Sequence, residues 1–151
     1  LPAGLLAGAR SQASNLCSAK VENPPNAPKI RVLTELGFDC FAGLGGLHLL
    51  EDYAAGVHAV MAGSGFVACN VALWDALTKD SDEAWERYTR MLPLLVFQMA
   101  SIDTFAAIQK ELLKQRGILE NTRLRRPGRV LDEQQQAWLA NLVERTGVMS
   151  S

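Results

Sequence analysis

Lys20 is the residue whose position best suits covalent chemistry. It ends a mostly apolar run, Asn15 to Lys20, that favours a β-strand, and two prolines, Pro24 and Pro25, then indicate a loop. A strand that delivers an amine to a poorly hydrated site disfavours the ammonium form and lowers its pKa, so free amine is available to attack a carbonyl carbon. A lysine at a strand end can also extend its stem and keep its amine in water. The pattern leaves both interpretations open.

Glycine-rich turns follow the other strand candidates. Gly43-Leu44-Gly45-Gly46 follows the apolar run Phe38 to Ala42, and Gly63-Ser64-Gly65 follows Val57 to Ala62. Glycine lets the backbone approach a ligand closely and turn N–H groups toward its oxygens. Each segment can equally be a tight connection into the next helix.

Other side chains near these strand ends have weaker signals. Met61, Ala62 and Gly63 end the third strand candidate and are expected to form a pocket wall, since none can transfer a proton. Glu22 could tune the Lys20 site electrostatically or be a solvated loop carboxylate. Ser64 could contact a substrate hydroxyl or a phosphate, or serve only the turn.

The elements that must position these residues alternate along the chain. The three strand candidates are continuously apolar, which is typical of parallel strands covered on both faces. Helical spacing occurs at Leu1 to Arg10, Asn26 to Leu36, Leu47 to Ala55, Ala68 to Thr78, Asp80 to Ala100, Asp103 to Gln115 and Asp132 to Arg145. Repeated βα units indicate an α/β fold, either a doubly wound sheet or a (β/α)₈ barrel, with the strand ends on one face. Three strands cannot close a barrel.

Composition excludes several classes of function. The 151 residues are 48% hydrophobic and 21% charged, with a net charge of -1, so no field favours nucleic acid or an anionic membrane surface. The basic residues Arg123, Arg125, Arg126 and Arg129 are interpreted as a solvated loop. No apolar run approaches the roughly 18 residues that span a bilayer. The apolar start has no basic segment ahead of it and is not expected to be a signal peptide.

The metal-ligating side chains are few and scattered. Cys17, Cys40 and Cys69 lie in apolar surroundings without CxxC spacing, which indicates buried thiols in a reducing compartment, and we expect a cytoplasmic protein. His48 and His58 share no metal-ligand spacing with each other or with an acidic residue. We therefore expect no metal and no cofactor.

Taken together, these features resemble the C-terminal half of the dihydrodipicolinate synthase and N-acetylneuraminate lyase family, the pyruvate-type class I aldolases and dehydratases. The matching features run in the family's order along nearly the whole chain. They are the strand ending in Lys20, the strand ending at Ala42-Gly43, the helix stop Gly56, the strand Val57 to Ala62, Ala84 to Pro93, Gln109 to Leu113, Gly117 and Arg126-Pro127.

The resemblance implies a fold. It predicts the last three strands of a (β/α)₈ barrel with their helices, at residues 1–79, followed by a three-helix appendix at residues 80–151. The chain departs from the family by having Lys-Val-Glu where many relatives have Lys-Glu, and Ala-Gly-Leu-Gly-Gly where the lysine-biosynthesis enzymes have a Ser-Gly-Asp type of turn. These differences favour a divergent member with an unknown substrate.

The resemblance also implies a reaction. Lys20 would form a Schiff base with pyruvate or another 2-keto acid, and Gly43, Leu44, Met61, Ala62 and Gly63 would bind the substrate. The first half of the barrel would carry the catalytic tyrosine and a threonine pair. Tyr53 and Tyr88 cannot replace that tyrosine, because both lie in the middle of predicted helices.

The resemblance further implies partners. We expect a homo-oligomer, a tetramer or dimer, in which this chain is part of a longer polypeptide or needs the N-terminal half of the barrel. Two alternatives stay open: a non-catalytic module that binds a small anion or another chain, and a phosphate-binding barrel fragment that uses Gly43 to Gly46 and Gly63 to Gly65.

Overall fold

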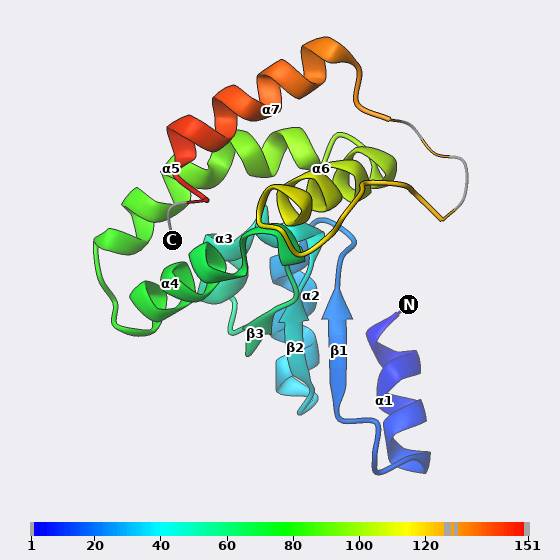
Figure 1. Cartoon of the computed structure of the whole chain (residues 1–151). Helices are drawn as coiled ribbons and strands as arrows, with labels where there is room; N and C mark the ends of the chain where they lie inside the picture. The colour runs from blue at the N-terminus through cyan, green and yellow to red at the C-terminus, as the bar shows by residue number, and fades with distance from the viewer. Residues whose placement is uncertain (1, 126–127, 129, 150–151) are drawn as a thin grey trace. The chain divides into compact units, whose positions relative to one another are not determined.

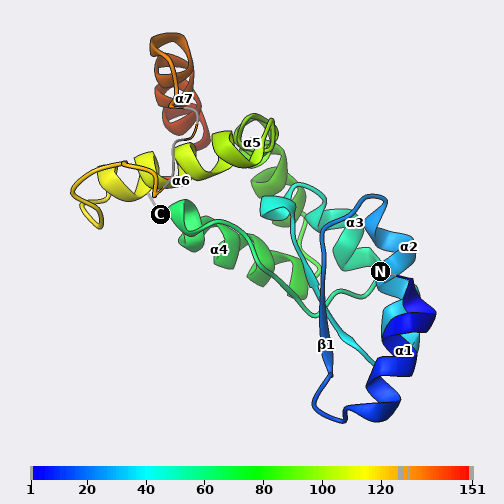
Figure 2. The same cartoon turned by 90° about the vertical axis from the view of Figure 1, so that its right-hand side faces the viewer.

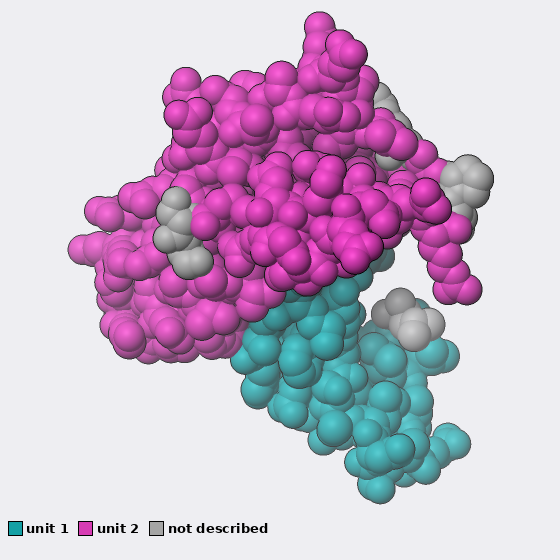
Figure 3. All heavy atoms as spheres, viewed as in Figure 1, with its two compact units in different colours: residues 1–62 teal, residues 63–151 magenta. Residues whose placement is uncertain are grey.

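The computed structural model describes residues 2–125, 128 and 130–149. The described residues form two compact units, Leu1–Ala62 and Gly63–Ser151, which Figure 3 colours separately. Helix α4 (Val67–Thr78) packs against helix α5 (Glu83–Gln98) and lies in the second unit. The ranges expected for the barrel part, 1–79, and for the appendix, 80–151, stay predictions. Three residues of the predicted basic loop and of the matching features, Arg126, Pro127 and Arg129, lie outside the described residues.

The first unit contains the sheet. Within its described residues three strands, β1 (Ser18–Val21), β2 (Asp39–Ala42) and β3 (Ala59–Val60), are paired in parallel in the order β1-β2-β3 (Figure 1). This confirms the predicted parallel pairing. β1 starts later than predicted and continues through Val21, so Lys20 is its penultimate residue and pairs with Phe41.

Helices cover one side of this sheet. Figure 2 shows α1 (Ala3–Gln12), α2 (Asn26–Glu35) and α3 (Leu49–Ala54) on the same side of the strands. α2 packs on β1, β2 and α3, and its Ile30 is fully buried with Cys40 of β2 and Leu49 of α3. α2 ends where predicted, because Gly37 takes a φ of 79° that favours glycine. This packing fixes where the strands, and therefore Lys20, lie within the unit.

The second unit is helical in its described residues. The 3₁₀ turn η2 (Ser64–Phe66) packs on α6 (Ile102–Gln115), α5 packs against α6, and α7 (Glu133–Thr146) packs against α5. The largest fully buried apolar side chains of its core are Phe66, Leu73, Leu94, Leu95, Ile108, Leu112, Leu139 and Val148. Pro93 lies inside α5 without dividing it.

Polar contacts close the ends of these helices. Asp132 and Gln135 form a capping box at the start of α7, and Gly147 takes the left-handed conformation at its end. The buried Val148 that follows is held from two helices: its carbonyl oxygen accepts hydrogen bonds from Arg116 Nη2 at 2.7 Å and from Cys69 Sγ at 3.7 Å. The last described turn is therefore part of the core.

Some side chains lie elsewhere than predicted. Cys17 is exposed, whereas Cys40 and Cys69 are buried as expected. Trp85 and Trp138 lie at helical spacing with apolar residues, yet they are 66% and 51% exposed and so do not belong to the core of this chain. Helical spacing shows that a face is apolar but does not show whether another element covers it.

Candidate active site

The candidate site is built around an ion pair at the carboxyl end of β1. Lys20 Nζ lies 2.9 Å from Glu22 Oε1, and the two side chains are 40% and 47% exposed. Side chains two residues apart in an extended chain point to the same face, so the Lys-Val-Glu spacing itself brings this amine and carboxylate together. The intervening residue, Val21, is buried.

Glu22 also binds the turn that follows β2. The backbone N–H of Leu44 donates to Glu22 Oε1 at 3.1 Å, so one carboxylate oxygen receives hydrogen bonds from Lys20 and from the turn. The hydrogen bond from Lys20 is the main cause that lowers the pKa of Glu22, and the Leu44 N–H acts in the same direction, while partial burial opposes both. Glu22 is therefore a bridging carboxylate that is also 47% exposed, and its two contacts favour the interpretation that it tunes the Lys20 site.

The turn itself has an unusual backbone. Leu44 has a φ of 51°, and Gly45 and Gly46 have φ values of 61° and 84°. A non-glycine residue at positive φ is uncommon because its Cβ is crowded there. Gly43 is needed for another reason: a Cβ at this position would overlap with the Glu22 side chain. Lys20, Gly43 and Leu44 are thus brought together through Glu22.

The ion pair opens onto a groove in the first unit. This groove has a volume of about 540 Å³ and lies among α1, β1 and α2. Leu6 and Val32 line it with apolar surface, while Lys20, Glu22 and Lys29 supply charge. Lys29 is engaged with the carbonyl oxygen of Asn23. Both members of the ion pair are thus lining residues of this groove.

Met61 and Ala62 lie at the end of β3, in the same unit as Lys20. The Met61 N–H donates to the carbonyl oxygen of Ala42 at 2.8 Å, so the ladder with β2 extends one residue past β3. Met61 is 49% exposed and Ala62 is half-buried. These residues stay proposed pocket walls.

Gly63, the last predicted site residue, belongs to the second unit. It is buried, and a Cβ there would overlap with the side-chain amide of Gln109. The same amide accepts a hydrogen bond from Gly65 N at 2.6 Å and donates one to Gln98 Oε1 at 2.8 Å. Gln98 was not singled out in the sequence, and Gln109 was named only within the matching segment Gln109 to Leu113, because a buried amide within a helical pattern gives no signal of its own.

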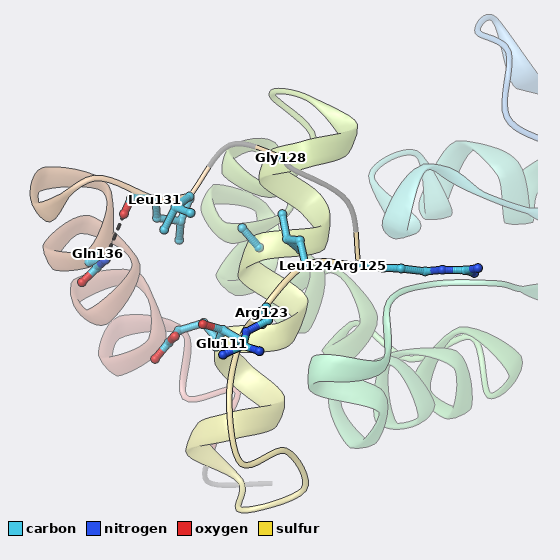
Figure 4. A pocket seen from close by; sticks show the side chains of 10 residues that line it. Glu111, Arg123, Leu124, Arg125, Gly128, Leu131 and Gln136 are labelled. Carbon is cyan, nitrogen blue, oxygen red and sulfur yellow. Dashed lines mark hydrogen bonds between the residues drawn. The ribbon is translucent and has the colours of Figure 1, made fainter.

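A second pocket lies within the second unit. It has a volume of about 450 Å³ and is lined by α6, the following loop and α7 (Figure 4). Glu111 and Arg123 come from one side, and Leu131 and Gln136 from the other, where Gln136 Nε2 donates to the carbonyl oxygen of Leu131 at 2.9 Å. None of these side chains is a predicted site residue.

The described part of the chain contains no group of three or more His, Cys, Asp or Glu side chains placed to hold a metal ion. Among the same residues, no helix combines the length and the apolar character that crossing a membrane requires.

Known proteins resemble this chain over a large part of its length. No protein-family model matches it. The chain is 30% identical, over 132 residues, to L-2-keto-3-deoxyarabonate dehydratase of Azospirillum brasilense, and this match covers 84% of the chain and 42% of the relative. The chain therefore spans less than half the length of that curated relative.

Solved structures resemble the fold. The 4-hydroxy-tetrahydrodipicolinate synthase of Methylacidiphilum fumariolicum SolV matches with a TM-score of 0.83 and 20% identity, over 97% of this chain and 49% of that one. YagE, a prophage protein of the dihydrodipicolinic acid synthase family from E. coli K12 in complex with pyruvate, matches with a TM-score of 0.78 and 19% identity, over 98% and 52%. At these identities the structures establish the fold alone, which is part of a (β/α)₈ barrel with its helical appendix. The chain is thus similar, in sequence and in fold, to the C-terminal half of a dihydrodipicolinate synthase family protein.

Proposed function

We propose that this chain supplies the imine-forming lysine of a lyase that acts on pyruvate or a related 2-keto acid. Lys20 is the nucleophile, and its amine forms a Schiff base with the ketone carbon. The observation that carries the proposal is the position of Lys20, at the carboxyl end of a parallel strand, paired with Glu22 beside the Gly43-Leu44 turn. Active sites of barrel enzymes are built at this end of the strands.

Two of the similar proteins support the substrate class. The curated relative is named as a dehydratase of a 2-keto-3-deoxy sugar acid, and YagE was solved with pyruvate. Both compounds carry a ketone next to a carboxylate. An amine that attacks such a ketone forms an iminium, which withdraws electrons from the neighbouring carbon and permits aldol cleavage, condensation or loss of a hydroxyl.

The chain supplies part of the chemistry. Its tyrosines Tyr53 and Tyr88 lie in α3 and α5, and we do not assign them a proton-transfer role. We propose that such groups come from a barrel half that precedes this segment in related proteins. We also propose a dimer or tetramer, which sedimentation of the folded protein would test.

Borohydride trapping tests the nucleophile. Borohydride reduces an imine to a stable secondary amine, so pyruvate and borohydride should add a defined mass to the peptide that contains Lys20. The measurement uses the folded protein that carries this chain. Lys20→Ala should lose the adduct, and Lys79→Ala, which removes an exposed lysine of the second unit, should keep it. Absence of the adduct from Lys20 would refute the proposal.

The alternative of a phosphate-binding module is less well supported. The Leu44 N–H that would bind a phosphate oxygen already donates a hydrogen bond to Glu22. Binding of inorganic phosphate, measured by calorimetry, together with no pyruvate adduct would favour this alternative.

A further inference from the structure

We propose that Glu22 is the counter-ion of the Lys20 nitrogen in two successive states, the ammonium of the free protein and the iminium of the keto-acid adduct. This inference rests on the proposed function and assigns Glu22 a role in it. Glu22 Oε1 lies 2.9 Å from Lys20 Nζ, the atom that forms the new bond. Glu22 therefore contacts a reacting atom.

The charge balance of imine formation explains why one carboxylate serves both states. The ammonium first loses a proton to water. The amine nitrogen then bonds to the ketone carbon as the carbon–oxygen π bond breaks, and a proton passes from this nitrogen to the alkoxide oxygen to give the carbinolamine. The carbinolamine hydroxyl takes back the proton that water received and leaves as water when the carbon–nitrogen double bond forms. The sum is ammonium plus ketone giving iminium plus water. The same nitrogen carries one positive charge before and after.

The number of N–H donors on the Lys20 nitrogen falls during imine formation, although its positive charge is the same in both states. An ammonium has three N–H donors, but an iminium formed on a ketone keeps one. A fixed acceptor close to Nζ can take that remaining donor and hold the nitrogen in its protonated form, in which it withdraws electrons from the substrate. A charged acceptor makes the hydrogen bond stronger than a neutral one does.

The surrounding turn keeps Glu22 in place. Its Oε1 also accepts from Leu44 N at 3.1 Å, and Gly43 packs against the glutamate side chain where any Cβ would overlap with it. The backbone contact does not depend on Lys20, so the carboxylate is held when the lysine changes its chemical state. A preorganised charge of this kind stabilises a charged intermediate without moving.

Trapping yields in a charge-neutral variant test this role. Glu22→Gln keeps an acceptor for Leu44 N but removes the negative charge. At saturating pyruvate, loss of this charge should shift the Lys20 adduct from the iminium toward the neutral imine, which borohydride reduces more slowly. We expect about two- to fivefold less reduced adduct on Lys20 after a brief exposure to borohydride, the range typical of partly exposed ion pairs. Glu35→Gln, which neutralises an exposed carboxylate of α2, should give the parent yield, and Glu22→Asp should recover part of the loss. Equal yields in the parent and in Glu22→Gln would overturn the inference.

Acylation without a keto acid separates this inference from the proposed function. Only a free amine reacts with an acylating reagent. In Glu22→Gln, Lys20 is no longer paired with a carboxylate, so its acylation relative to that of Lys79 should rise about two- to fivefold. An unchanged ratio would overturn the inference even if the parent forms the adduct. A raised ratio with no adduct in the parent would refute the proposed function, and with it the iminium role. Circular dichroism confirms that each variant is folded.

Discussion

Gly43 packs so closely against Glu22 that a Cβ on this glycine would overlap with the Cγ, Cδ and Oε1 atoms of the glutamate. The Glu22 side chain, which follows β1, thus fills the position that a side chain of Gly43, in the turn after β2, would occupy. The carboxylate of Glu22 is bound there by the N–H of Leu44 and by the amine of Lys20. A substitution at Gly43 therefore acts on the lysine site through Glu22.

Gly43→Ala should displace Glu22 and destabilise the first unit. Overpacking of this kind costs about 1–3 kcal/mol. We expect a lower free energy of unfolding in urea and faster acylation of Lys20. Gly4→Ala is the matched control, because a Cβ at this position of α1 meets no atom within 4 Å, and it should be neutral or slightly stabilising. Unchanged stability and acylation in Gly43→Ala would contradict the packing described.

Asp52→Asn should stabilise the first unit relative to the parent, and this gain in stability should be larger at higher pH. Asp52 is 1% exposed and accepts a hydrogen bond from Asn26 Nδ2 at 3.3 Å. Burial raises its pKa above the ordinary 3.8, and the hydrogen bond from Asn26 opposes this shift. The folded state thus holds the proton more tightly than the unfolded state, so the stability that this carboxyl contributes is present below about pH 3.8 and is lost as the pH rises through the raised pKa.

Urea unfolding at pH 4 and pH 7 measures this effect. The difference between Asp52→Asn and the parent should favour the variant more at pH 7, since the amide keeps the contact with Asn26 and carries no charge. Glu35→Gln, at an exposed position of the same unit, should show a much smaller change. An equal difference at both pH values would contradict the buried environment of Asp52.

Gln109→Leu should destabilise the second unit by about 1–3 kcal/mol. The variant removes the acceptor of the buried Gly65 N–H, and a buried donor without a partner costs roughly this much. Thermal unfolding measures the loss. Gln115→Leu, at the exposed end of α6, should change stability by less than about 0.5 kcal/mol. Equal effects of the two variants would show that the contact between Gln109 and Gly65 contributes nothing.

Asp132→Ala should cost about 1 kcal/mol, because the Asp132 side chain accepts a hydrogen bond from Gln135 N at 2.8 Å and so caps α7. The free energy of unfolding of the protein measures this. Gln134→Ala, at the second residue of α7, leaves the cap intact and should hardly change the free energy of unfolding. A full loss of stability in Gln134→Ala with none in Asp132→Ala would contradict the cap.

The sequence predicted the order and type of the elements well because helix periodicity and glycine stops are local. Strand limits were less accurate, since they depend on the partner: β3 has two residues where six were expected, and β1 starts at Ser18, opposite Asp39. The ion pair of Lys20 with Glu22 was foreseeable from their spacing within an extended segment. The exposure of Trp85 was not, because helical spacing does not show which faces are covered.

The attachment of Val148 has a consequence for synthesis. Its carbonyl oxygen binds Cys69 and Arg116, which are translated 79 and 32 residues earlier. During synthesis, the hydrogen bonds of Cys69 and Arg116 to Val148 can therefore form only after the segment that follows α7 has been translated. The buried Val148 side chain and these two hydrogen bonds are therefore the last parts of the described core of the second unit to be synthesised.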